Sequence, residues 1–165
     1  MSATHTVLSP RALKPASGSG VARWFRALVG RPAPRAQVIA PTQVPLGAEL
    51  AVSWRLDFGR RSITNVTVAL VGSEVARQRL SARTGISIVT ETHPFVTLEI
   101  DRQMPDHGAR EAHGRGAVRA PAALVPTVTG RLNEIAWAVV IEAAHQAELV
   151  WRDEFPLVAL PAVRP

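Results

Sequence analysis

Two histidines and two carboxylates fall within one polar stretch, QMPDHGAREAHGRG, at residues 103–116. His107 and His113 offer imidazole nitrogens, and Asp106 and Glu111 offer oxygens, a donor set that suits a divalent metal ion. A metal site also needs rigid, converging ligands and neighbouring groups that orient them, whereas this stretch is rich in glycine. We therefore expect a solvated polar loop and keep a metal-binding or hydrolytic domain using this loop as the alternative.

Paired carboxylates are the second candidate for chemistry. Asp153 and Glu154 are adjacent, and Glu99 and Asp101 lie two residues apart in a predicted strand, where alternate side chains share a face. Two carboxylates on one face can raise the pKa of one of them, which suits general acid–base catalysis. Surface strands carry such pairs routinely, so we expect no catalytic role for them.

Other signatures of catalysis are absent from the sequence. The chain has no cysteine, which excludes thiolate chemistry and disulfide bonds. It contains no glycine-rich phosphate loop, nucleophile elbow or metalloprotease motif. His93 and His145 fall at expected strand ends and are read as structural or exposed. The sequence therefore predicts a protein that is not an enzyme, with no metal, cofactor or small-molecule substrate.

The positive charge of the chain is confined to its beginning. The net charge is +6, and residues 1–35 contain six basic and no acidic side chains. Residues 36–165 contain 13 side chains of each sign and are neutral. A split of this kind indicates a basic arm attached to a neutral domain. We therefore expect a flexible arm over residues 1–35, punctuated by Pro, Ser and Gly, and a folded domain over residues 36–165.

A short amphipathic helix is predicted within the arm, at about residues 21–30. Apolar and aromatic side chains repeat there at helical spacing beside arginines. Such a helix can lie on an anionic membrane surface or against a protein, and it can also fold back onto the domain. Nucleic acid is a less favoured partner because the neutral domain offers no basic groove. The candidate membrane- or partner-binding residues are Arg23, Trp24, Phe25, Arg26, Leu28, Val29 and Arg31.

From residue 36 onward, apolar residues recur with the period of β-strands. Short strands separated by turn residues, without a long helical segment, predict an all-β antiparallel sandwich. Trp54 and Trp137 are its expected large core residues. No apolar run reaches the length that spans a bilayer. The expected strands are 49–56, 65–72, 74–80, 86–92, 95–101, 115–120, 133–143 and 148–160.

The order of these elements resembles the arrestin-like, immunoglobulin-like β-sandwich domain. A Pro/Gly turn in PTQVPLGAEL, residues 41–50, precedes one strand, and a V-x-L-x-G pattern at residues 68–72 ends the next. The later matches are a proline at 121 that ends a strand, a Pro-Thr pair at 126–127, I-x-W-x-V at 135–139 and the closing ELVWRDEFPLVAL at 148–160.

The resemblance covers residues 36–161 and implies a non-catalytic interaction domain. It is closest to the soluble domain of uncharacterised bacterial membrane-associated proteins. The charged core and phosphate-sensing lysines of visual-type arrestins have no counterpart here, because the single lysine, Lys14, lies in the arm. Receptor recognition of that kind is therefore not implied.

Two prolines, Pro121 and Pro126, precede the most regular strand of the chain. Proline lacks a backbone donor and fixes φ, so it does not pair in a central strand. The chain is therefore predicted to leave one sheet at Pro121, cross the edge of the sandwich, and enter the facing sheet with Ile135–Ile141.

The sequence favours a non-catalytic protein-interaction or assembly module, such as an adaptor or scaffold. Recognition through a sheet edge or surface is expected, with a protein as the main partner. The basic arm is expected to attach the domain to an anionic membrane face or to a larger complex, and it could also lie along a neighbouring subunit. We expect a cytoplasmic location, peripheral to the inner membrane.

Overall fold

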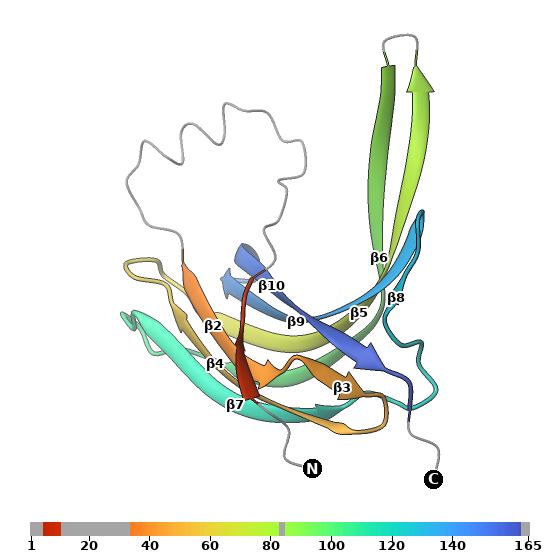
Figure 1. The fold of residues 1–165 in the computed structure, drawn as a ribbon. Helices are drawn as coiled ribbons and strands as arrows, with labels where there is room; N and C mark the ends of the chain where they lie inside the picture. The colour runs from red at the N-terminus through yellow and green to blue at the C-terminus, as the bar shows by residue number, and fades with distance from the viewer. Residues whose placement is uncertain (1–4, 11–33, 83–84, 163–165) are drawn as a thin grey trace.

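The computed structural model describes residues 5–10, 34–82 and 85–162, and within them the chain forms ten β-strands (Figure 1). Alternation of apolar and polar residues produces these strands. In Glu49–Asp57, for example, every second side chain is buried and the others are exposed. The strands are β1 His5–Leu8, β2 Arg35–Pro41, β3 Gln43–Pro45, β4 Glu49–Asp57, β5 Asn65–Ala82, β6 Gly85–Gln103, β7 Glu111–Arg119, β8 Val128–Thr129, β9 Asn133–His145 and β10 Glu148–Leu160.

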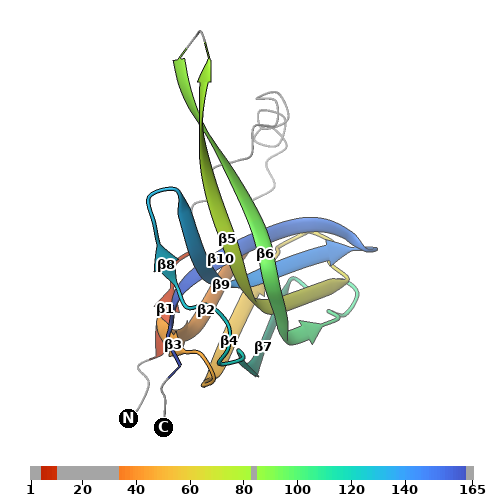
Figure 2. The same cartoon turned by 90° about the vertical axis from the view of Figure 1, so that its right-hand side faces the viewer.

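The strands pack as two facing sheets, which confirms the predicted all-β sandwich (Figures 1 and 2). One sheet has the order β1-β2-β4-β7, and the other has the order β3-β10-β9-β5-β6, with β8 added to β9. The prediction of a wholly antiparallel sandwich is wrong at one place, because β3 pairs with β10 in parallel. The chain leaves the first sheet after Pro41 and joins the edge of the second at once, where Val158 donates to the Thr42 carbonyl at 2.9 Å.

The core lies between the two sheets and is apolar throughout the described residues, with no buried polar or charged side chain among them. Trp54 and Trp137 are 4% and 1% exposed, as the sequence predicted for the large core residues. Alternate residues of β4, β5, β9 and β10 supply the rest of this layer. The largest fully buried side chains besides Trp137 are Phe155, Leu50, Leu56, Leu70 and Ile141.

Part of the predicted arm belongs to the sandwich. His5–Leu8 form an edge strand that pairs antiparallel with β2, and Leu8 is buried in the core with 5% exposure. The prediction of a flexible segment is therefore wrong for these four residues and also for Arg35, which begins β2. A buried leucine facing an existing apolar layer explains the difference, because its burial favours pairing over a free chain end. The helix predicted at residues 21–30 lies outside the described residues.

The segments predicted as separate strands between residues 65 and 101 form one long hairpin, β5–β6. The possible breaks at Gly72 and Pro94 are absorbed as a β-bulge: Gly72 pairs with Val96 and Ser73 with Pro94, which leaves Phe95 unpaired. A bulge lets an edge strand carry a proline without ending. The hairpin consequently runs well beyond the sandwich.

The crossover predicted from the two prolines is confirmed. β7 lies in the four-stranded sheet, β8 and β9 lie in the six-stranded sheet, and residues 120–127 connect β7 to β8. The indole Nε1–H of Trp137 donates to the Val125 carbonyl at 3.0 Å, and Thr127 donates its backbone N–H to the Ala159 carbonyl at 2.8 Å. These bonds hold the connection against β9 and β10.

The two sheets are joined directly where β6 passes β7. The indole Nε1–H of Trp54 on β4 donates to Asp101 on β6 at 2.9 Å, although these strands belong to different sheets. Gly114 and Gly116 of β7 make room for this approach. A Cβ at Gly116 would collide with the carbonyl oxygen of Ile100, and one at Gly114 with the Asp101 carboxylate.

The predicted loop at 103–116 is too long, because part of it belongs to the strand that contacts β6. β7 begins at Glu111, so the connection between β6 and β7 covers only residues 104–110. β7 is a strand although its sequence is polar and contains glycine. Its two glycines, Gly114 and Gly116, stand where β6 crosses it, and Ala112, between these glycines and the preceding turn, is buried.

Candidate interaction surface

The β5–β6 hairpin extends past the end of β9 as a free two-stranded ribbon (Figures 1 and 2). The pairing of β5 with β9 ends at Ala76, and Arg77 makes a last backbone bond to Leu132 at 2.7 Å. Beyond this point β5 and β6 pair only with each other, from Gln78–Val89 to Ala82–Gly85, among the described residues. Both edges of the ribbon are therefore unpaired there.

The direction of the backbone groups on the ribbon follows from the bond of Arg77. Arg77 turns its N–H toward the β9 side, so it and its partner Thr90 form a non-hydrogen-bonded pair across the hairpin. Alternation then places Ile88 and Thr92 in the same class as Thr90. These residues direct their N–H and C=O groups away from β5, along the free edge of β6.

Exposed apolar side chains gather on the ribbon and at its base. On the ribbon, Ile88 is 61% and Val89 37% exposed. At the base, the bulged residue Phe95 is 43% exposed and meets the buried Trp137 ring edge to face, with centroids 5.7 Å apart. Gly72 makes room for Phe95, since a Cβ there would lie 2.8 Å from the ring. The adjoining stretch between β7 and β9, which includes β8, adds the exposed residues Val125, Val128 and Leu132.

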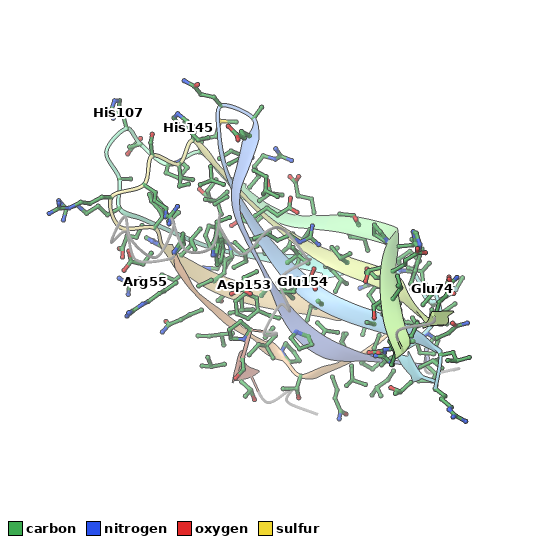
Figure 3. All side chains as sticks on the ribbon, turned by 90° about the horizontal axis from the view of Figure 1, so that it is seen from above. Arg55, Glu74, His107, His145, Asp153 and Glu154 are labelled. Atoms are coloured by element: carbon green, nitrogen blue, oxygen red, sulfur yellow. The ribbon has the colours of Figure 1, made fainter. Side chains whose placement is uncertain are left out.

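The outer face of the six-stranded sheet is a less open surface. Ala69, Val71 and Val140 point away from the core there and are nonetheless buried. Glu154, which Figure 3 labels, is the register neighbour of Val140 in the pairing of β10 with β9. Arg152 binds both Glu142, at 2.6 Å, and Glu154, at 3.0 Å. The charged ends of these side chains are paired with one another, and their aliphatic parts lie beside the small apolar residues. This face therefore presents fewer unpaired groups to a binding partner than the ribbon does.

The histidine-containing stretch does not form a ligand cluster in the part of the chain that the structure describes, where no group of three potential metal ligands converges. His107 lies in the turn after β6, whereas His113 lies on β7 opposite Arg55. Glu111 is bound to the guanidinium of Arg55, with a distance of 3.1 Å from Nε. Figure 3 places His107, in the turn after β6, and His145, the last residue of β9, at the same end of the sandwich. Within the described residues, the positions of these histidines do not favour the metal-binding or hydrolytic alternative.

The prediction that Glu99 and Asp101 share a face is wrong. Asp101 pairs with Val68 and Glu99 with Ala69, so a β-bulge at Ile100 separates them. Asp101 points to the core side and accepts the Trp54 bond, whereas Glu99 is on the outer face and binds Arg102. The hydrogen bond from Arg102 lowers the pKa of Glu99, the opposite of what acid catalysis near neutral pH needs.

Asp153 and Glu154 face opposite sides of β10 and also do not form a pair of acids. Glu154 binds Arg152, and Asp153 lies on the core side of the strand, opposite Ile141. Burial raises the pKa of Asp153 above its ordinary value of 3.8, although Asp153 accepts a bond from the Glu154 N–H. The charged form is thus disfavoured in the folded state.

An Asp153→Asn variant is expected to unfold at a higher temperature than the native chain at neutral pH. A raised pKa in the folded state means that stability falls as the pH rises from the ordinary carboxyl pKa through the raised one. Asparagine avoids this loss and still accepts from Glu154. Thermal unfolding across pH checks the prediction: the advantage should vanish below the ordinary pKa, and a lower melting temperature at pH 7 would contradict it.

The residues predicted to bind a membrane or partner, Arg23 to Arg31 in the arm, lie outside the described residues. Among the described residues, no helix is long and apolar enough to cross a membrane. The ribbon was missed because the sequence was divided into short strands at Gly72 and around Arg83–Gly85. The run ISIVT on β6, rich in β-branched residues and free of charge, is the signal that could have marked an unusual edge strand.

The chain matches no protein family and no curated protein. Among solved structures, it is similar to the crystal structure of Spo0M, a sporulation control protein from Bacillus subtilis, with 14% identity and a TM-score of 0.48. The match covers 78% of this chain and 49% of the Spo0M chain, so it spans about half of that protein. Similarity at this level carries no conclusion about activity or partners.

Proposed function

We propose that this chain is a non-catalytic protein-interaction or assembly module, built on an arrestin-like β-sandwich, that binds an extended segment of a partner protein at the free edge of β6. The observation that supports this proposal is the ribbon, whose backbone groups at Ile88, Thr90 and Thr92 have no partner among the described strands. A row of unpaired N–H and C=O groups is the feature that strand addition uses.

The sequence of the edge favours binding by strand addition. Natural edge strands are usually protected by charges, prolines or bulges. On β6 the first charged residue after Gly85 is Glu91, and the first proline is Pro94. Residues 86–90, which precede Glu91, are rich in β-branched residues, which suit an extended backbone. Main-chain bonds would supply affinity, and the exposed Ile88 and Val89 side chains would supply selectivity.

Selection of a displayed library of short random peptides against the full chain tests whether the β6 edge binds an extended segment. Selected peptides are expected to be extended and rich in β-branched residues. A Thr90→Pro variant, which removes one outward N–H, should weaken their binding at least about tenfold. An Arg79→Pro variant removes an N–H from the opposite edge of the same ribbon and is the matched control. Equal binding by all three proteins, measured by calorimetry, would contradict the proposal.

We further propose that the basic arm attaches the module to the cytoplasmic face of the inner membrane or to a larger complex. Basic residues near an anionic surface contribute about 1 kcal/mol each, so the arginines around Trp24 and Phe25 could hold the domain reversibly. The arm cannot be tested by truncation at Ala36, because that would also remove β1 and the buried Leu8.

Co-sedimentation with anionic vesicles is therefore best done with full-length variants. Replacing Arg23, Arg26 and Arg31 by glutamine is expected to reduce vesicle binding severalfold, and the binding of the native chain should weaken as salt rises. Replacing Arg115 and Arg119, exposed on β7, together with Arg60, gives a control with the same loss of charge. If the native chain does not bind, or if both triple variants bind alike, the arm is not a membrane attachment.

A further inference from the structure

The free edge of β6 has a defined length. β6 begins at Gly85, and Pro94, which has no N–H to donate, interrupts the edge at the bulge. The segment available for pairing is therefore Ile86–Thr92, and its central residue is Val89. We infer that the strand that binds this segment is the same segment of a second copy, so that the chain pairs with itself across a two-fold axis at Val89. This inference rests on the proposed function, because it uses the same edge.

The direction of the backbone groups permits this pairing. In antiparallel register about Val89, Ile88 of one copy lies opposite Thr90 of the other, and both residues direct their backbone groups to the free edge. These two residues can therefore exchange a full pair of hydrogen bonds on each side of the axis. Val89 turns its backbone groups toward β5, so the two Val89 residues would meet as a non-hydrogen-bonded pair, in which side chains come closest.

The charges along the segment also suit self-pairing in this register. Glu91 lies opposite Ser87 of the other copy, and Ile86 lies opposite Thr92, so no like charges meet. A register centred on Glu91 would instead place two carboxylates opposite each other, which is unfavourable. Cross-strand pairs of β-branched residues fill the remaining positions.

Pairing with a second copy explains why the edge is left unprotected. A two-stranded ribbon that stands alone is marginally stable in water, whereas two ribbons joined at β6 form a four-stranded ribbon. The contact is isologous, so each copy covers the β6 edge of the other and this contact is closed at two copies. The exposed Ile88 and Val89 would both gain neighbours, which accounts for their apolar character.

A Val89→Cys variant of the full chain tests the inference, because the native chain has no cysteine. In the proposed register the two Cα atoms at position 89 would lie about 4.5 Å apart, within the range that a disulfide bridges. Mild oxidation is therefore expected to convert most of the variant to a covalent dimer, seen on a non-reducing gel and reversed by a reductant. Light scattering of the native chain should show a mass that rises toward two copies with concentration.

Two matched variants test the register of the pairing and the edge through which the two copies pair. An Ile88→Cys variant should cross-link poorly, because its cysteines would be diagonal neighbours about 7–8 Å apart. Adding Thr90→Pro to Val89→Cys should abolish cross-linking, whereas adding Arg79→Pro should not. A native chain that stays monomeric, with Val89→Cys cross-linking no faster than Ile88→Cys, would overturn self-pairing. Selected peptides that still bind the β6 edge would then leave the proposed function standing, and peptides that ignore this edge would overturn both.

Discussion

A Trp137→Ala variant is expected to lose about 4 kcal/mol of its free energy of unfolding. Trp137 is the largest fully buried side chain of the described residues. Its ring packs against Phe95 at the base of the ribbon, and its Nε1–H holds the Val125 carbonyl of the crossover. The variant therefore removes a large apolar group and leaves a carbonyl without its donor, and both losses are destabilising. Denaturant unfolding of the two proteins measures the difference.

The Trp137→Phe variant separates the two contributions. It keeps most of the apolar group and loses the hydrogen bond, so we expect a loss nearer to 1–2 kcal/mol. Proteolysis of the alanine variant should also become faster at residues 121–127, since Trp137 holds this connection in place. If the Trp137→Ala and Trp137→Phe variants lose the same small amount of unfolding free energy, the Trp137 ring is not the centre of the core as described.

A Gly116→Ala variant is expected to lose about 3 kcal/mol, at the upper end of the range for overpacking. The added methyl group would meet the backbone oxygen of Ile100, and backbone cannot move aside as a flexible side chain can. The expected response is a separation of β6 from β7, which would also weaken the bond between Trp54 and Asp101. Chemical denaturation measures the loss, and tryptophan fluorescence should report the change around Trp54.

An Ala117→Val variant is the control for this prediction. It adds bulk on the exposed face of the same strand, one residue further along, so its effect should lie within about 0.5 kcal/mol. If Gly116→Ala is as harmless as Ala117→Val, then β6 does not pass as close to β7 as the structure places it, and the direct joining of the two sheets would have to be abandoned.

The parts of the fold that could be predicted are those that follow from local pattern. Alternation along 49–56 places Trp54 in the core, and the pattern of β9 does the same for Trp137. The two prolines of the crossover could be interpreted because a missing donor excludes central pairing whatever the surroundings are. In each case the physical cause acts within a few residues of the sequence.

The parts that could not be predicted depend on contacts between distant segments. Leu8 is buried only because β2 lies beside it, and the bulge at Ile100, which separates Glu99 from Asp101, appears only in the pairing of β5 with β6. The glycines of β7 look like loop residues until the passage of Ile100 beside them is known. A register shift of one residue moves every later side chain of the strand to the opposite face of the sheet. Predictions that two residues share a face therefore fail across such a shift.

Hydrogen exchange of backbone amides, read residue by residue on the full chain at a concentration where it is monomeric, tests most directly the claim that the β6 edge is the binding surface. Adding a selected peptide is predicted to protect the amides of Ile88 and Thr90, which point outward, while the amide of Val89, already bonded to β5, changes little. Protection that appears on β9 and β10 instead, with Ile88 and Thr90 unchanged, would contradict the account.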